Sequence, residues 1–129
     1  MSVLFVNLPV ASLDRATAFY LQLGFAVNLQ LSGAEMTALA KGRVQLLLHT
    51  HAGYQQAKQD SGSDSETAAK AFLSLQVDTR DEVARLYDCA MNAGAKAVGG
   101  AIDHGLVYGR SFSDPDAHCW QVFWMGIQQ

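Results

Sequence analysis

Apolar and polar residues alternate in short runs along this chain, and turns or helical stripes separate the runs. Residues 4–10 are apolar at every second position, which predicts a strand with one wholly apolar face. The next stripe, at Ala16, Phe19, Tyr20 and Leu23, has the spacing of an amphipathic helix. Further strands are predicted over residues 25–31, 36–40 and 44–49. The first part of the chain therefore reads strand, helix and three strands.

The same order recurs in the second half. FVNLPVASLDRATAFY begins at Phe5 and FLSLQVDTRDEVARLY begins 67 positions later at Phe72, with no gap between the two copies when they are aligned. A strand is predicted over residues 71–77, a helix over 81–93, and strands over 97–102, 107–113 and 119–125. This organisation predicts an α+β domain of two βαβββ modules, residues 1–51 and 71–129, joined by residues 52–70.

Boundary signals accompany both predicted helices. Ser12 or Asp14 can cap the first helix, and Gly24 follows its last turn. Gly94 follows the second helix in the same way. Residues 52–70 are rich in Gln, Ser, Asp, Gly and Lys, and this composition predicts a mobile polar connector.

Composition narrows the classes of function. The net charge is −3 and the nine Lys and Arg residues are scattered, which argues against nucleic-acid binding. No stretch approaches the roughly 20 apolar residues of a membrane span, and the chain opens on a strand pattern, so a cytoplasmic protein without a membrane partner is expected. Cys89 and Cys119 match no disulfide framework or paired metal motif and are expected to be small buried apolar residues, with a thiol nucleophile at Cys119 as the alternative.

Two segments carry a resemblance to a known family. NLPVASLDRATAFYLQLGF near the start and YGRSFSDPDAHCWQVFWM near the end resemble the vicinal oxygen chelate superfamily of glyoxalase I, bleomycin-resistance proteins and extradiol dioxygenases. Ala117 stands where the family's terminal hairpin commonly has glycine. The resemblance implies a curved mixed eight-stranded sheet with helices outside and a central cavity, and commonly a homodimer.

The resemblance also implies where a divalent metal would be held. The family's four ligand positions correspond here to Phe5, Leu47 (give or take one residue), Phe72 and Gln121. A divalent ion needs N, O or S donors, and only Gln121 offers one. We therefore expect no metal site and no cofactor, and a cavity across which Phe5 and Phe72 face each other.

Alternation predicts which other side chains share the cavity face. Asn7 should accompany Phe5, and Ser74 and Gln76 should accompany Phe72. Gln45 and His49 should flank Leu47, and Cys119 and Phe123 should flank Gln121. Phe5 and Phe72 can instead be core, Asn7 can bind neighbouring backbone, and Gln121 can pair with Asn7. Aromatic walls with a few amides suit a small aromatic or polar organic ligand. The candidate ligand residues are Phe5, Asn7, Leu47, His49, Phe72, Tyr108, Arg110, Gln121 and Phe123, and Gln45, Ser74, Gln76 and Cys119 are expected to share their faces of the strands.

Tyr108 and Arg110 share one face of a predicted strand, whether inward or outward. Arg110 offers a fork for a carboxylate or phosphate, or an ion pair with a nearby aspartate. Trp120 and Trp124 fall on the face opposite Gln121, either under the helices as core or at a subunit contact.

The histidines support an alternative function. His49 and His51 are expected on one face of a strand, His104 in a loop, and His118 in a structural turn. A metal held by His49, His51 or His104 would make the protein a glyoxalase-like lyase or a dioxygenase. A third hypothesis is a purely structural role with a filled cavity. We favour metal-independent binding of a small molecule.

Overall fold

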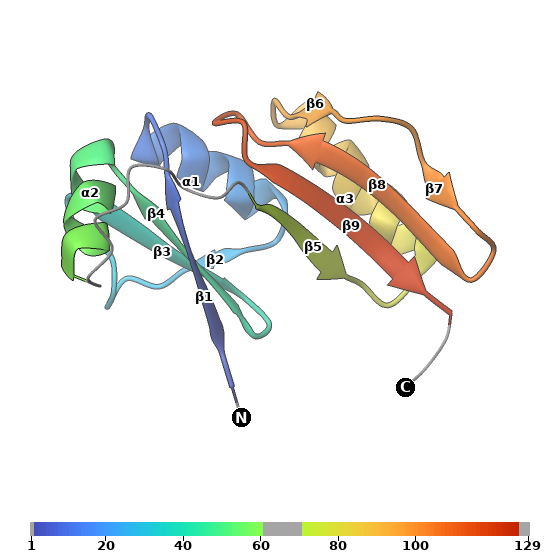
Figure 1. The fold of residues 1–129 in the computed structure, drawn as a ribbon, viewed down its shortest axis with the longest axis horizontal. Coiled ribbons are helices and arrows are strands. Elements are labelled where there is room, and N and C mark those ends of the chain that lie inside the picture. Colours follow the sequence, from blue (N-terminus) through green and yellow to red (C-terminus); the bar gives the residue numbers. More distant parts are fainter. Residues whose placement is uncertain (1, 61–70, 127–129) are drawn as a thin grey trace. The chain divides into compact units, whose positions relative to one another are not determined.

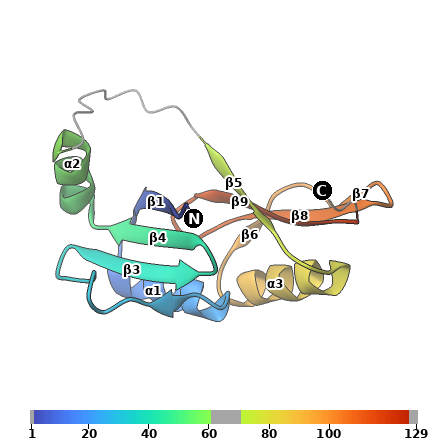
Figure 2. The same cartoon turned by 90° about the horizontal axis from the view of Figure 1, so that it is seen from below.

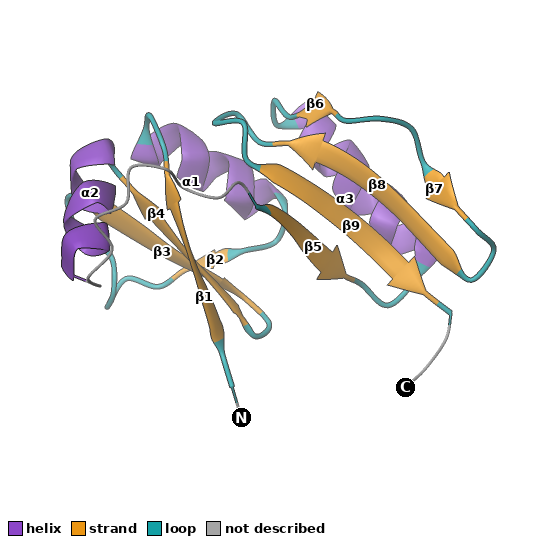
Figure 3. Cartoon of the chain, viewed as in Figure 1, coloured by secondary structure: helices purple, strands orange, loops and turns teal. Residues whose placement is uncertain are grey.

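Two compact units, which divide between residues 69 and 70, make up the chain. A computed structural model describes residues 2–60 and 71–126, called module one and module two below (Figure 1). Each module combines helices with a mixed sheet, as the colouring by secondary structure shows (Figure 3). The α+β class and the repeated strand–helix–strands order are therefore confirmed, and residues 2–60 and 71–126 contain nine strands in two sheets in place of the eight expected.

Module one forms a four-stranded sheet in the order β1-β4-β3-β2. The terminal strand β1 runs parallel to β4, and the remaining pairs are antiparallel. Its elements are β1 (Leu4–Pro9), α1 (Leu13–Gln22), β2 (Ala26–Val27), β3 (Met36–Lys41), β4 (Val44–His49) and α2 (His51–Asp60).

Module two repeats this plan with the sheet order β5-β9-β8-β6, and β7 also pairs with β8. Its first strand β5 is again parallel to its last strand β9. The elements are β5 (Phe72–Gln76), α3 (Arg80–Asn92), β6 (Lys96–Ala97), β7 (Ile102–Asp103), β8 (Val107–Ser113) and β9 (Cys119–Met125).

One long helix covers one face of each sheet, α1 in module one and α3 in module two (Figure 2). Phe19 and Tyr20 of α1 are buried and make an edge-to-face pair with ring centroids 5.0 Å apart. In module two, Tyr87 of α3 meets Phe112 of β8 at 6.5 Å. The helix-covered face is the hydrophobic core of each module. The buried side chains include Ala16, Leu39, Leu46 and Leu48 in module one, and Val83, Leu86, Trp120 and Val122 in module two.

Local side-chain contacts fix the ends of these helices. The Oγ of Ser12 accepts from the Arg15 amide at 3.2 Å, so Ser12 caps α1. Thr79 caps α3 by accepting from the Glu82 amide at 3.0 Å. Gly24 and Gly94 follow the helices with φ of 93° and 108°, a backbone conformation that glycine adopts without strain.

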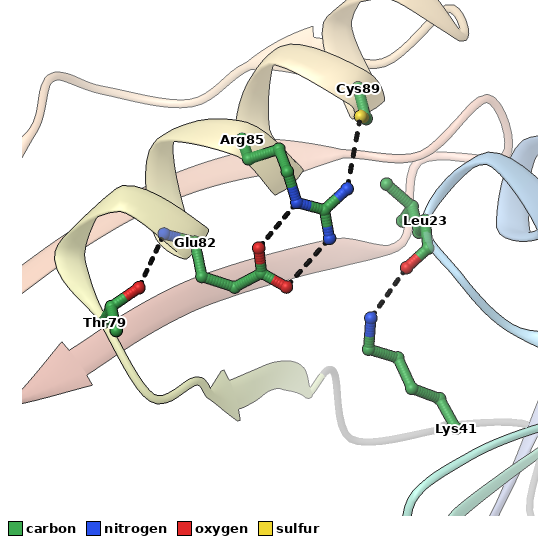
Figure 4. A network of polar contacts seen from close by, with 6 residues as sticks. All are labelled: Leu23, Lys41, Thr79, Glu82, Arg85 and Cys89. Atoms are coloured by element: carbon green, nitrogen blue, oxygen red, sulfur yellow. Dashed lines mark hydrogen bonds and ion pairs between the residues drawn. The ribbon is translucent and has the colours of Figure 1, made fainter.

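Charged side chains add further contacts at the helices, and Figure 4 draws those of Lys41 with Leu23 and of Arg85 with Glu82. Lys41 Nζ donates to the Leu23 carbonyl at 2.8 Å, which places a cation at the negative end of α1. On α3, Arg85 forms an ion pair with Glu82 one turn earlier, with its Nε 2.6 Å from Oε1. Both partners of this pair are partly exposed, so we expect little effect on stability.

The predicted connector over residues 52–70 was wrong in its first part. Residues His51–Asp60 form α2, and residues 61–70 lie outside the described residues. Thr50 begins this helix, because its Oγ1 accepts from the Gly53 amide at 3.0 Å. The Ala, Gln and Lys residues of this segment are good helix formers, and polarity alone did not reveal this property.

Two predicted strands are also shorter than expected. In place of a strand over residues 97–102, β6 and β7 are two residues each, because Gly99 between them has φ of 66° and breaks the extended backbone. Of the strand predicted over residues 25–31, only β2 is formed. Asn28 starts a turn, because its carbonyl accepts from the Leu31 amide and the Ser32 hydroxyl.

The DPDAH turn before β9 is built around Asp114, which is only 3% exposed. Its Oδ1 accepts from the amides of Asp116 and His118 at 2.9 and 2.8 Å. Ala117 within the turn has φ of 69°, in the left-handed region where a Cβ is strained.

We expect Ala117→Gly to raise the free energy of unfolding by about 0.5–1 kcal/mol. Relief of the left-handed strain of roughly 1–2 kcal/mol exceeds the entropy that glycine adds to the unfolded chain. Urea unfolding of both proteins measures this difference. Ala117→Val is the control and should be less stable than the natural protein, because a β-branched side chain tolerates positive φ poorly. A glycine variant less stable than the natural protein would contradict the assignment of strain.

Candidate ligand site

The pairing of the strands assigns each predicted residue to one of two sheet faces. In module one, Phe5 lies beside Gln45, and Asn7 beside Leu47. His49 follows two residues after Leu47 and is on the same face. This face is opposite the one covered by α1, and we call it the open face of module one. The structure thus brings together Phe5, Asn7, Gln45, Leu47 and His49.

Module two has an equivalent open face, opposite α3. Ser74 of β5 lies beside Gln121 of β9, and Ser111 of β8 lies on the other side of Gln121. Cys119 and Phe123 flank Gln121 on the same face. Phe72 and Gln76 complete the set at the two ends of β5. The predicted face assignments of these six β5 and β9 residues agree with the register.

The two phenylalanines of the sequence repeat are exposed. Phe5 is 48% and Phe72 is 68% accessible, whereas the core rings of Phe19 and Phe112 are 2% and 0% accessible. A ring left open to water adds little to the stability of its module. Neither ring therefore belongs to the helix-covered core of its own module.

A pocket of about 310 Å³ lies within module two, beside Phe72. Four of its lining residues, Phe72, Ser111, Cys119 and Gln121, belong to the open face. It is mostly apolar, with an amide, a hydroxyl and the thiol of Cys119 as its polar groups. Cys119 is exposed, so the prediction that it is a buried apolar residue was wrong. All of its lining residues are Phe72, Val98, Ser111, Phe112, Cys119, Trp120 and Gln121.

The side chain of Gln121 is oriented by its neighbour. Ser74 Oγ donates to Gln121 Oε1 at 3.3 Å, so Gln121 has a partner within its own sheet. Asn7, which the sequence offered as an alternative partner for Gln121 or for backbone, bonds to His49 instead. The distance from Asn7 Oδ1 to His49 Nε2 is 2.8 Å.

His49 borders a second pocket, of about 360 Å³, within module one. The side chain is 5% exposed, and its ring packs against Tyr54 of α2 with centroids 6.0 Å apart. The carboxylates of Glu35 and Asp60 are also at this pocket, where Glu35 accepts from the Thr50 hydroxyl and Asp60 accepts from Gln56. On the open face near β1, Gln45 Oε1 is buried and has no hydrogen-bond partner among the described residues.

Burial lowers the pKa of His49 from its ordinary value of 6.5. The unfolded chain therefore binds a proton more readily than the folded one, and this residue's contribution to stability is present above about pH 6.5 and is lost as the pH falls toward the folded-state pKa. We expect the natural protein to lose more stability than His49→Gln between pH 7.5 and pH 5.5. Urea unfolding of both at each pH measures this difference, and identical pH dependence in the two proteins would contradict the burial argument.

Tyr108 and Arg110 are separated from the other candidate residues. They lie beside Trp124 and Val122 in the register and therefore on the α3 face, opposite Gln121. The guanidinium of Arg110 stacks on Tyr87 at 3.8 Å, and that of Arg80 stacks on Tyr108 at 4.7 Å. The sequence also allows an ion pair of Arg110 with Asp103 or Asp114, but Asp103 is bound by Arg80. Tyr108 and Arg110 therefore stabilise the α3 interface and do not join the open face.

Trp120 and Val122 of β9 also lie at the interface between the sheet of module two and α3. Trp120 and Val122 are buried beneath α3, at 4% and 2% exposure. For Trp120 the structure shows the core alternative, whereas Trp124 is only partly buried, with the Arg80 guanidinium 5.5 Å from its ring centroid.

The predicted histidine pair is not formed. His51 is the first residue of α2 and is exposed, while His49 ends β4, so the two do not share a strand face. Within the described part of either module, no three His, Cys, Asp or Glu side chains are placed to hold a metal ion. Of the four positions where the resemblance implies metal ligands, Phe5, Leu47, Phe72 and Gln121, only Gln121 has a side-chain oxygen or nitrogen, and this set does not fit a divalent ion.

Some lining residues were absent from the sequence-based set. Val98 and Ser111 line the module-two pocket, and Glu35 and Met36 line that of module one. Ser111 becomes visible only when β8 is paired with β9, because the alternation within one strand does not reveal its neighbours. Residues of α2 also line the module-one pocket, and the helix propensity of this segment was the sequence signal that could have revealed them.

The fold and the open faces define a protein of two repeated modules, each with a helix on one face of a mixed sheet and candidate ligand residues on the other. The family model of the Glyoxalase/Bleomycin resistance protein/Dioxygenase superfamily matches residues 2–122, and the chain belongs to that superfamily.

Solved structures with this fold are distant in sequence. The hypothetical protein SA1046 from S. aureus is 26% identical with a TM-score of 0.76, over 96% of this chain and 94% of that one. A family enzyme from Burkholderia phytofirmans PsJN is 23% identical with a TM-score of 0.80, over 97% and 99%. Lactoylglutathione lyase from Agrobacterium tumefaciens is 19% identical with a TM-score of 0.66, over 95% and 92%. No curated protein matches the chain. Among the described helices, none has the length and apolar character needed to cross a membrane.

Proposed function

We propose that this protein binds a small planar organic molecule in the module-two pocket, without a metal ion at the family's ligand positions. The observation that carries the proposal is the exposed ring of Phe72 beside the amide of Gln121, at the edge of a mostly apolar pocket of about 310 Å³. An aromatic wall with a few directed polar groups is typical of sites for small organic ligands.

The donor set supports binding without a metal. The resemblance to the superfamily implies that Phe72 and Gln121 stand at its ligand positions in module two, and their neighbours in the register carry hydroxyls and one thiol. A single neutral amide does not compete with water for a divalent ion. Gln121 is therefore available to bind the ligand directly.

A fragment screen tests the proposal. Aromatic fragments that bind the native protein should raise its melting temperature by mass action. Occupancy of the pocket should also slow the alkylation of Cys119 by iodoacetamide, because this exposed thiol lines the pocket. Cys89 on α3 is the internal control and should react at an unchanged rate. Both rates can be read from one digest by mass spectrometry.

Two matched variants locate the site. Phe72→Ala should abolish the protection of Cys119, since it removes the aromatic wall. Leu29→Ala removes an 81% exposed apolar side chain from module one and should leave the protection unchanged. The proposal fails if fragments that stabilise the protein leave Cys119 fully reactive, or if no fragment in the screen binds.

A homodimer is the assembly that we propose for the chain, because the resemblance to the superfamily implies one. Trp120 and Val122 are buried within module two, so these two side chains are not available for the contact. Size-exclusion chromatography with light scattering gives the mass directly, and a monomer at all concentrations would overturn this assignment.

A further inference from the structure

We infer that the ligand of the module-two pocket is uncharged and presents a hydrogen-bond acceptor to the side-chain amide nitrogen of Gln121. This inference rests on the proposed function and specifies the chemical class of the molecule bound. Three observations carry it: the orientation of Gln121, the absence of charge among the lining residues, and the open ring of Phe72.

Gln121 presents a donor to the pocket. Its Oε1 already accepts from the Ser74 hydroxyl at 3.3 Å. Within residues 2–60 and 71–126, the Nε2 group has no hydrogen-bond partner. A primary amide nitrogen only donates, so the complementary ligand atom is an acceptor such as a carbonyl oxygen or a ring nitrogen.

The pocket offers no compensation for an ionic charge. None of its lining residues is acidic or basic. The nearest basic residue in sequence, Arg110, is on the other face of β8 and stacks on Tyr87. Transfer of an ion from water into such surroundings is strongly unfavourable without a partner. The lining therefore selects neutral ligands over anions and cations of the same shape.

Phe72 and Ser111 complete the recognition. The Phe72 ring can stack on a planar group, and Ser111 lies directly beside Gln121 in the register, where its hydroxyl can donate or accept. A planar ring bearing a carbonyl group satisfies the stacking and the hydrogen bond together.

Four probes of nearly equal shape separate the effect of the hydrogen-bond acceptor from the effect of ligand charge. Acetophenone is neutral with an acceptor, α-methylstyrene lacks the acceptor, benzoate is an anion and benzamidinium is a cation. Titration of each into the ¹⁵N-labelled protein, followed at the backbone amide signals of Ser111 and Cys119, gives the dissociation constants. Acetophenone should bind about threefold to tenfold more tightly than α-methylstyrene, which is the usual contribution of one hydrogen bond. Benzoate and benzamidinium should bind more weakly than acetophenone.

Two variants of one residue test the role of the amide. Gln121→Leu should bind acetophenone and α-methylstyrene equally, because the donor is lost. Gln121→Glu should favour benzamidinium over acetophenone, because a carboxylate replaces the donor. Circular dichroism confirms that both variants are folded.

The outcomes distinguish the inference from the proposed function. Equal binding of all four probes to the natural protein, or tighter binding of either ion, overturns the inference and leaves a small-molecule pocket in place. If none of the four probes binds while other fragments protect Cys119, the inference is overturned and the proposed function stands. If no fragment protects Cys119, both fail.

Discussion

Replacing Phe112 with alanine is expected to lower the free energy of unfolding by about 3–5 kcal/mol. The ring is 0% exposed and packs edge-to-face against Tyr87 of α3. Truncation removes its buried apolar surface and leaves a cavity between β8 and α3 that neighbouring side chains cannot fill completely. Urea unfolding followed by far-ultraviolet circular dichroism measures the loss.

Phe72→Ala is the matched control, since it makes the same chemical change in the same module. Its ring is 68% exposed, so we expect a change within about 0.5 kcal/mol, as for an ordinary surface substitution. The contrast between the two variants separates core from candidate site. A loss at Phe72 as large as the loss at Phe112 would show that Phe72 is core and would remove the aromatic wall of the proposed pocket.

Asp114→Ala is expected to cost about 2–3 kcal/mol, the second largest effect. The buried carboxylate accepts from the amides of Asp116 and His118, and alanine would leave both donors without this acceptor. The same turn leads into β9 and so positions Cys119 and Gln121. We therefore expect weaker ligand binding together with lower stability.

Asp114→Asn is the control, because its Oδ1 can still accept from both amides. We expect it to retain more than half of the stability lost in Asp114→Ala, as measured by urea unfolding. Equal losses of stability in the two variants would contradict the claim that these two hydrogen bonds stabilise the turn.

The repeat and the helix boundaries followed from the sequence because they depend on local physics. Ser12 and the glycines Gly24 and Gly94 act within a few residues of their own positions. Alternation along one strand likewise placed Phe5 with Asn7, and Cys119 with Gln121, on shared faces. These inferences required no knowledge of how the strands pair.

The remaining features depend on contacts between distant segments. Tyr108 and Arg110 share a face in any strand, but only the pairing of β8 with β9 shows that this face meets α3. The partnership of Asn7 with His49 spans 42 positions and follows from the parallel pairing of β1 with β4. The α2 helix was missed for another reason, since its polar composition outweighed its helix propensity in the prediction.

The metal requirement of ligand binding tests the central claim most directly. A fragment that protects Cys119 should be titrated into the protein before and after exhaustive dialysis against EDTA, and again with Zn²⁺, Ni²⁺, Mn²⁺ or Fe²⁺ added. Because Phe72 has no metal-binding atom and Gln121 offers only one neutral amide, we expect the same dissociation constant in every sample. Binding that is lost with the chelator and restored by one equivalent of an ion would contradict the account and favour a metal-dependent glyoxalase-like enzyme.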